Sequence, residues 1–245
     1  IKIRLNGLSQ WVGIKNAPNN QSLAVDGRQG QQSGLAGFLY NDKNGNTYQK
    51  GAKLSFAHHL ILDYKNSQYL SFGMSFVLND FYIDISEFDS GYDAIVTDNR
   101  QLKNYNVDLG FLYRYKSMFF SANVSNLLKK NVDNFIIKEP DLLRNFSAYT
   151  GYRFKNYSRD LEIEPSIFYQ FFENDKRSST DINLKARFLD FDNYFWAGIS
   201  YRFLNDQMLK PLNIGPMAGF KKNNLYFAYS YQVTTNSIIG YNSGT

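Results

Sequence analysis

Alternation between apolar and polar side chains, sustained over stretches of about ten residues, constrains this chain more than any other feature. In 104–115 every odd position is apolar or aromatic, from Tyr105 to Tyr115, and most even positions are polar. Segments 52–64 and 181–188 alternate in the same way. Because successive side chains of a strand point to opposite faces, each run has one apolar and one polar face. Runs of this length fit a tilted membrane crossing better than the usual strand of a globular domain.

Counting these runs predicts about thirteen strands. They lie near 1–13, 20–28, 34–42, 52–64, 68–79, 103–115, 118–126, 145–155, 160–172, 180–189, 194–203, 212–220 and 225–233. Short polar turns, as at Lys65–Ser67 and Lys116-Ser117, alternate along the chain with longer segments. The longer segments are 43–50, 80–102, 127–144, 173–179 and 204–211. This alternation predicts an all-β fold, a transmembrane up-and-down antiparallel β-barrel with tight periplasmic turns and longer outer loops. A Greek-key sandwich would not alternate so evenly.

The parity of the strand count adds an expectation. Bacterial barrels have an even number of strands, which returns the chain to the periplasm. We therefore expect one more strand after Thr245, about fourteen in all, and a single outer-membrane barrel domain over 1–245. Pro165 and Pro216 fall within strand patterns, and we expect a bulge or a strand end at each because proline cannot donate to a ladder.

Composition agrees with this interpretation and narrows the function classes. Aromatic residues make up 17%, with 19 Tyr and 21 Phe, although mean hydropathy is −0.43. Transmembrane strands combine these properties, because lipophilic residues occupy alternate positions and aromatic side chains gather at the interfaces. The net charge of +5 comes without a lysine/arginine block, so we expect no nucleic-acid partner and instead contact with lipopolysaccharide phosphates. The alternative is a soluble sandwich or propeller with its apolar faces inward.

Few residues are candidates for chemistry. His58 and His59 are the two histidines, and as strand neighbours they point to opposite faces; a catalytic His59 would need a serine or carboxylate partner in space. Glu162 and Glu164 share one face, the spacing of paired acid/base carboxylates and equally of a polar barrel lumen.

A calcium site in the outer loop remains an alternative for the acidic residues Asp89, Asp93 and Asp98, although they lack EF-hand spacing. No GxSxG, HExxH or phosphate-binding glycine loop occurs in the sequence. We predict no catalytic residue, no cofactor and no metal, and hence not an enzyme.

Several short segments follow one another in a characteristic order along the chain. They are Gln10-Trp11-Val12-Gly13, Ala17-Pro18, Gln21-Ser22-Leu23, Asn41-Asp42-Lys43, Leu70-Ser71-Phe72-Gly73, the hairpin Val107–Tyr113 with Met118–Leu128, Ala197–Arg202, Tyr229-Ser230-Tyr231 and Asn242–Thr245. In order and spacing these segments resemble the PorP/SprF family over nearly the whole chain.

The resemblance implies an outer-membrane component of the type IX secretion and gliding motility system of Bacteroidota, which are Gram-negative bacteria. Such proteins are similar to docking barrels for secreted surface proteins, including gliding adhesins. They are thought to recognise the cargo's C-terminal domain and to anchor it at the cell surface, with periplasmic type IX secretion components alongside.

The long-loop end is the predicted partner-binding surface. Rigid strands position loops, and 80–102 and 127–144 exceed the usual hairpin length. They mix charges with apolar and aromatic residues, as an interface does. These residues are Phe88, Tyr92, Ile95, Phe135, Ile136 and Ile137. One alternative is that the loops fold inward and plug the lumen. At the level of function, the alternatives are an outer-membrane channel for small or hydrophobic solutes, and a hydrolase.

Overall fold

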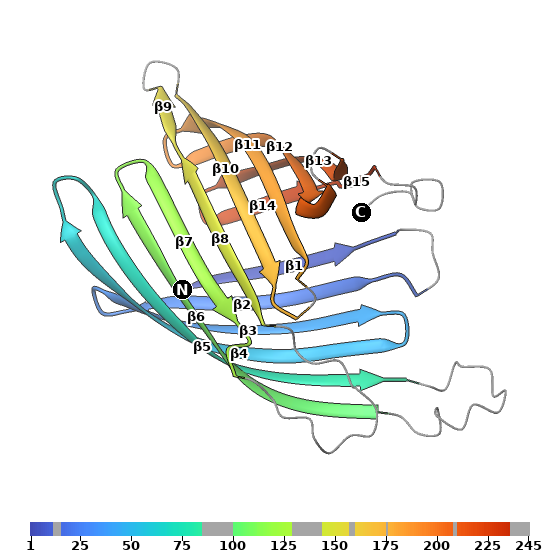
Figure 1. Cartoon of the computed structure of the whole chain (residues 1–245). Helices are drawn as coiled ribbons and strands as arrows, with labels where there is room; N and C mark the ends of the chain where they lie inside the picture. The colour runs from blue at the N-terminus through green and yellow to red at the C-terminus, as the bar shows by residue number, and fades with distance from the viewer. Residues whose placement is uncertain are drawn as a thin grey trace, which may run out of the picture.

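The computed structural model describes residues 1–11, 16–84, 100–128, 144–156, 160–174, 176–207 and 210–235. The described strands all belong to one antiparallel sheet (Figure 1). They are β1 (Lys2–Ser9), β2 (Asn19–Gln29), β3 (Ser33–Asn44), β4 (Thr47–Asp63), β5 (Gln68–Ile83), β6 (Arg100–Tyr115), β7 (Met118–Ser125), β8 (Asn145–Tyr152), β9 (Phe154–Asn156), β10 (Leu161–Phe172), β11 (Ser178–Asp190), β12 (Asn193–Leu204), β13 (Pro211–Lys222), β14 (Leu225–Ser230) and β15 (Val233–Thr234). One short 3-10 turn, η1 (Asn205–Gln207), joins β12 to β13.

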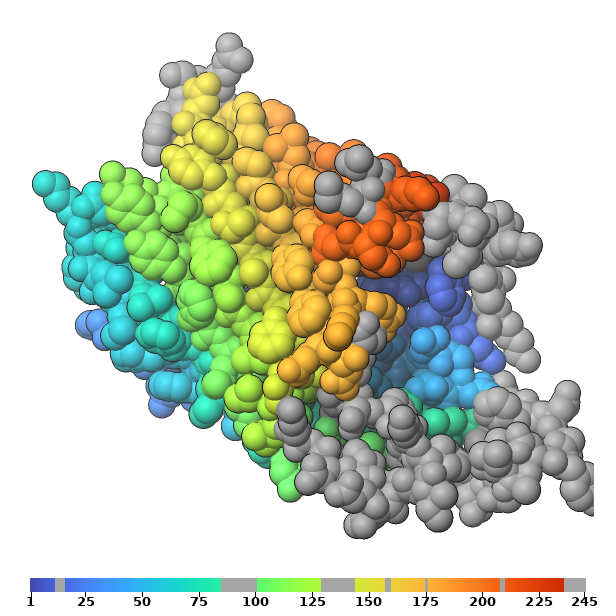
Figure 2. Space-filling model, viewed as in Figure 1, coloured from blue at the N-terminus to red at the C-terminus, as the bar shows by residue number. Residues whose placement is uncertain are grey.

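The sheet follows the order of the chain. Thirteen strands pair with their sequence neighbours from β1 to β14, while β9 continues the line of β8 and β15 that of β14. The predicted fold class, an all-β up-and-down antiparallel sheet, is confirmed. The sheet curls around a hollow, seen in Figure 2 between the yellow-to-orange strands and the blue N-terminal strands. The described β1 and β14 are not paired with each other, so the ring is open there. That 1–245 forms a single domain stays a prediction.

Short turns gather at one end of the sheet, here called the short-turn end. They include 64–67, 116–117, 191–192 and 223–224. At the opposite end, the long-loop end, the predicted loop at 43–50 is wrong. There β3 ends at Asn44 and β4 begins at Thr47, with Gly45 at a φ of 60° in the turn between them. The strands continue past the apolar alternation, because residues at the rim of a membrane barrel are polar on both faces.

The two prolines interrupt neighbouring strands rather than their own. The register of β10 with β11 runs through Pro165 without a shift, and that of β12 with β13 through Pro216, so the expected bulges are wrong. On the other side, β8 ends at Tyr152 and β14 ends at Ser230, each within one residue of the position that faces the proline. Proline has no N–H, so the ladder is lost on one side only.

Burial is inverted relative to a globular domain. Among the described residues the buried hydrophobic side chains are Val77, Phe119 and Trp196, whereas eleven polar or charged residues are buried. The convex face instead exposes rows of large apolar side chains, such as Leu54 at 64% and Leu78 at 50%. An apolar outer face around a polar interior is the arrangement of a membrane barrel, so the predicted alternative of a soluble sandwich is not supported.

Aromatic side chains form a row on the outer face near the short-turn end. Cross-strand pairing aligns four phenylalanines over β11–β14: Phe188 with Phe195, Phe195 with Phe220, and Phe220 with Phe227. All four are exposed on this face. Such rows border the lipid-facing band of outer-membrane barrels, where aromatic rings contact the interface. Within the described ranges, no helix is both long and apolar enough to cross a membrane.

Candidate functional site

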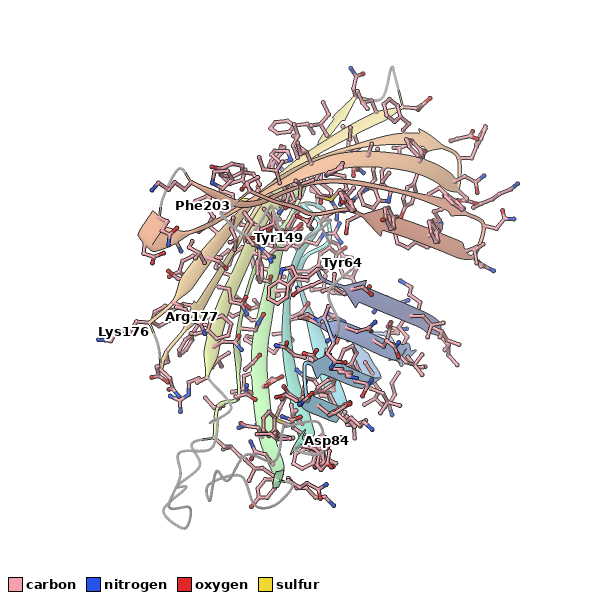
Figure 3. The ribbon with its side chains drawn as sticks, turned by 90° about the vertical axis from the view of Figure 1, so that its right-hand side faces the viewer. Tyr64, Asp84, Tyr149, Lys176, Arg177 and Phe203 are labelled. Carbon is pink, nitrogen blue, oxygen red and sulfur yellow. The ribbon has the colours of Figure 1, made fainter. Side chains whose placement is uncertain are left out.

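The residues predicted to bind a partner lie outside the described residues. This holds for Phe88, Tyr92, Ile95, Phe135, Ile136 and Ile137. The ends of β5, β6, β7 and β8 carry the two segments, and these four strands are neighbours in the sheet, so their ends lie together at the long-loop end. Asp84, which follows β5, marks this end in Figure 3.

The chain leaves β7 early and turns onto the inner face of β6. After Ser125, Asn126 takes a φ of 58°. Residue Asn106 then binds Leu128 twice: its Nδ2 donates to the Leu128 carbonyl at 3.1 Å, and its Oδ1 accepts the Leu128 N–H at 2.8 Å. Asn106 is among the most buried side chains described, at 2% exposed. Residues 126–128 are therefore held beside the inner face of β6, and the Leu127 N–H also donates to the Val107 carbonyl at 3.0 Å.

Asp108 links residues 126–128 to Lys53 on β4, the strand on the other side of β5. Its Oδ1 accepts the backbone N–H of Asn126 at 2.9 Å, and its Oδ2 lies 2.7 Å from Lys53 Nζ. Arg144, just before β8, donates to the Leu127 carbonyl at 2.8 Å and pairs with Glu173 at 3.2 Å. Residues 126–128, from which 129–143 departs, are thus held by two charged groups, Asp108 on β6 and Arg144 just before β8.

A cavity of about 270 Å³ opens on the inner face beside this segment. Its lining is rich in carboxamides, with two aromatic rings and one lysine. The residues that define this character are Asn20, Phe38, Tyr40, Gln49, Lys53, Asn79, Asn126 and Asn145. Tyr40 donates its hydroxyl to Asn79 Oδ1 at 3.0 Å. Carboxamides both donate and accept hydrogen bonds, so this lining suits a polypeptide backbone.

The two histidines occupy opposite faces, as predicted. His58 is on the outer face, 3.0 Å from Ser33 Oγ, and His59 is on the inner face with Nδ1 2.7 Å from Ser71 Oγ. His59 therefore does have a serine partner. A Ser-His pair becomes an activated nucleophile when a third group orients the histidine and donors stabilise the oxyanion, and the described contacts of His59 supply neither.

Glu162 and Glu164 lie on the inner face near the short-turn end, and cations surround them. Arg187 reaches both carboxylates: its Nη2 lies 3.0 Å from Glu164, and its Nη1 contacts Glu162. Arg153 and Lys185 lie 2.7 and 2.9 Å from Glu164. Each carboxylate contacts at least one cation, whereas a glycosidase needs one carboxyl group that donates a proton to the leaving group.

Sequence reasoning placed the glutamates on one face but did not find their cationic partners or the role of Asn106. Pairs across strands depend on register, which alternation within one strand does not report. On β6, the apolar face predicted from the alternation is the outer one: Tyr105, Leu109 and Phe111 are exposed there, and Asp108 faces the lumen. Asp89, Asp93 and Asp98 lie outside the described residues, and no metal-binding group of three His, Cys, Asp or Glu occurs among those described.

Comparison with known proteins addresses the whole arrangement. No curated protein matches the chain. The family described as type IX secretion system membrane protein PorP/SprF matches residues 1–245, in agreement with the resemblance of the short segments. With a continuous meander, an apolar outer face and this match, the chain belongs to the PorP/SprF family of type IX secretion system membrane proteins.

Proposed function

We propose that this chain is a non-enzymatic barrel of the outer membrane that docks or anchors secreted surface proteins, through their C-terminal domain, for type IX secretion and gliding. The outer wall contacts lipid, including lipopolysaccharide. Periplasmic secretion components meet the short-turn end, which faces the periplasm in barrels of this kind. The family match supports the role in secretion, and the surface of the sheet supports the choice of docking face.

The inverted burial carries the proposal. An apolar outer face in contact with lipid leaves the two ends and the lumen as the surfaces on which a polar partner can bind. At the long-loop end, the carboxamide-lined cavity and the fixed departure point of 129–143 form a preorganised surface. Preorganisation lowers the entropy lost when a partner binds, so this end is the favoured docking site.

The proposed contact residues are those predicted from the sequence. Phe88, Tyr92 and Ile95 follow β5, and Phe135, Ile136 and Ile137 follow β7. The cavity lies at the same end as both segments: Asn126 lines it two residues before 129–143, and Asn79 lines it on β5, which leads into the other segment. A C-terminal domain that enters from the cell surface would contact both.

The test shortens the two segments without disturbing their anchors. Residues 85–99 and 129–143 are each replaced by a short Gly-Ser linker, which keeps Asp84, Arg100, Leu128 and Arg144. The matched control replaces the turn 191–192 at the opposite end in the same way. Cargo at the cell surface is measured by antibody labelling of intact cells, and insertion by heat-modifiable gel mobility. We expect the shortened barrel to insert and to lose its cargo. Retained cargo, or a complex with the partner bound at the short-turn end alone, contradicts the proposal.

The polar inner face also favours a second function, an outer-membrane channel for small or hydrophobic solutes. Ion conductance of the purified protein across a planar bilayer separates the two. A channel conducts as purified, whereas a docking barrel conducts weakly.

A further inference from the structure

A set of basic side chains follows the inner wall near the short-turn end, from β6 to β13. We call it the lumenal basic belt, and it comprises Arg114, Arg153, Lys155, Lys185, Arg187 and Lys221. Arg114 pairs in register with buried Phe119, and Lys221 with Tyr194, which places both on the inner face. Among the described strand residues of this wall at this end, the acids on the inner face are Glu162 and Glu164. Six cations therefore face two carboxylates.

The two carboxylates fix the positions of the central cations but do not neutralise all of their charge. Glu162 and Glu164 have side chains only 5% and 4% exposed, while those of Arg153 and Lys155 are 33% and 45% exposed. Lys155 Nζ lies 3.8 Å from Glu162, a loose pair. The anions are thus buried beneath cations that still reach the lumen.

Aromatic rings also contact three cations of the belt, Arg153, Lys185 and Arg187. Lys185 lies 5.6 Å from the Trp196 ring centre, Arg187 lies 5.8 Å from that of Tyr194, and Arg153 lies 5.6 Å from that of Phe119. Cation–π contacts restrict long side chains without neutralising their charge. The belt is therefore a preorganised positive surface, which reduces the entropy lost when an anion binds.

We infer that the lumenal basic belt binds an acidic, extended segment of a periplasmic protein. This inference rests on the proposed orientation, in which the short-turn end faces the periplasm. Lipid headgroups are on the other side of the wall, because the outer face is the apolar one. From β6 to β13 the belt crosses strands spaced about 4.8 Å apart, an arc of roughly 30 Å. A single phosphate spans a few ångströms, whereas about nine extended residues with repeated carboxylates cover this arc.

Acids in the neighbouring turns do not change the sign of the belt. Asp63 accepts hydrogen bonds from Lys65 and Asn66 within its own turn. The carbonyl of Asp192 accepts from Lys221 Nζ at 3.0 Å, which holds that lysine beside the turn. Asp160 and Asp190 lie at the strand ends next to the glutamates. All of these lie at the rim, where water screens them more than it screens the inner wall.

The probe is a fluorescein-labelled decaglutamate peptide, with decaglutamine as the neutral comparison. Binding to the purified barrel in detergent is followed by fluorescence anisotropy at 50 mM and 300 mM NaCl. The test variant R114Q/K155Q/K221Q removes three cations and leaves the contacts of Glu164 intact. The matched control is K222Q, which removes a lysine next to Lys221 on the opposite, outer face. Heat-modifiable mobility verifies folding, and K221Q alone replaces any triple variant that does not fold.

We expect decaglutamate to bind, to weaken with salt, and to lose about tenfold in affinity in the triple variant. K222Q should bind like the unaltered protein. Equal binding of decaglutamine, unchanged affinity in the triple variant, or no binding of decaglutamate overturns the inference. If inorganic phosphate, added at the same total charge as the peptide, displaces the peptide, the belt is a site for small anions. This outcome also overturns the inference. The barrel with shortened loops should still bind the peptide, so this result is independent of cargo retention.

Discussion

Lys53 and Asp108 form an ion pair of 2.7 Å between β4 and β6, although β5 lies between these two strands. The lysine reaches across the inner face past buried Val77, its cross-strand neighbour. Curvature favours such a contact on the concave side, since it brings alternate strands closer there. The pair places Lys53 and Asp108 on the inner face, and the apolar neighbours of these residues, such as Leu54 and Leu109, are exposed on the outer face.

This assignment of faces predicts a large loss of stability for an arginine at one leucine of β6 and a small change at another. Leu109 is exposed on the outer face, and Leu112 on the inner face. Leu109→Arg should lower the free energy of unfolding by about 2–4 kcal/mol if the residue lies near the bilayer midplane, because the guanidinium then enters lipid. Leu112→Arg should change it by less than about 1 kcal/mol, since its side chain meets water. Urea unfolding in lipid vesicles, followed by tryptophan fluorescence, measures both. Equal effects of the two substitutions would contradict the assignment of faces.

The glutamate cluster makes a prediction about stability. Glu164→Gln removes the charge that binds Arg153, Lys185 and Arg187, and it leaves these cations close together. We expect the free energy of unfolding to fall by about 1–3 kcal/mol. Glu173→Gln is the control, because that carboxylate has one described ion pair and is 41% exposed, where a pair contributes about 0–1 kcal/mol. The same urea titration in vesicles compares them, and an effect at Glu173 as large as that at Glu164 would refute a cooperative cluster.

His59 is predicted to have no catalytic role despite its contact with Ser71. His59→Ala and Ser71→Ala should each leave cargo retention unchanged, since no chemistry is assigned to either residue. A fluorophosphonate probe, which labels activated serines, should not modify the purified barrel. His58→Ala on the outer face serves as the comparison, because it loses an equivalent serine contact. Labelling that disappears only with His59→Ala would reopen the hydrolase interpretation.

Much of the sheet was predictable because the sequence alternates wherever one face meets lipid. The strand predicted at 118–126 is observed at Met118–Ser125, and that at 160–172 at Leu161–Phe172. The wrongly predicted strand ends lie outside the lipid-facing band, where alternation is no longer required. Above the apolar band both faces meet water, so β3 and β4 continue through 43–50 with no alternation to mark them.

The candidate site was less predictable, for a physical reason. Alternation shows which face a residue occupies but not which residue lies opposite it on the next strand, and a one-residue change of register moves every pair. Glu162 and Glu164 could be placed on one face, but their contacts with Arg153, Lys185 and Arg187 depend on three registers. The inward turn at Asn126 depends on Asp108 and Asn106, which look like any polar lumen residues in the sequence.

That asparagine leads to the last prediction. Asn106 provides both hydrogen bonds that hold Leu128 against β6, and Asp108 provides one more to Asn126. Asn106→Ala should release Leu128 from the wall at a cost of about 1–3 kcal/mol, because its buried backbone groups lose their partners. The peptide bonds after Leu127 and Leu128 should then be cleaved faster by chymotrypsin added to intact cells, and cargo retention should fall, since 129–143 no longer departs from a fixed point. Asn104→Ala is the matched control. Asn104 is a buried asparagine of the same face and strand, and its cross-strand neighbour in the register is Asn79. If Asn106→Ala is cleaved no faster than Asn104→Ala, or if it keeps its cargo fully, the inward anchor does not position the docking segment.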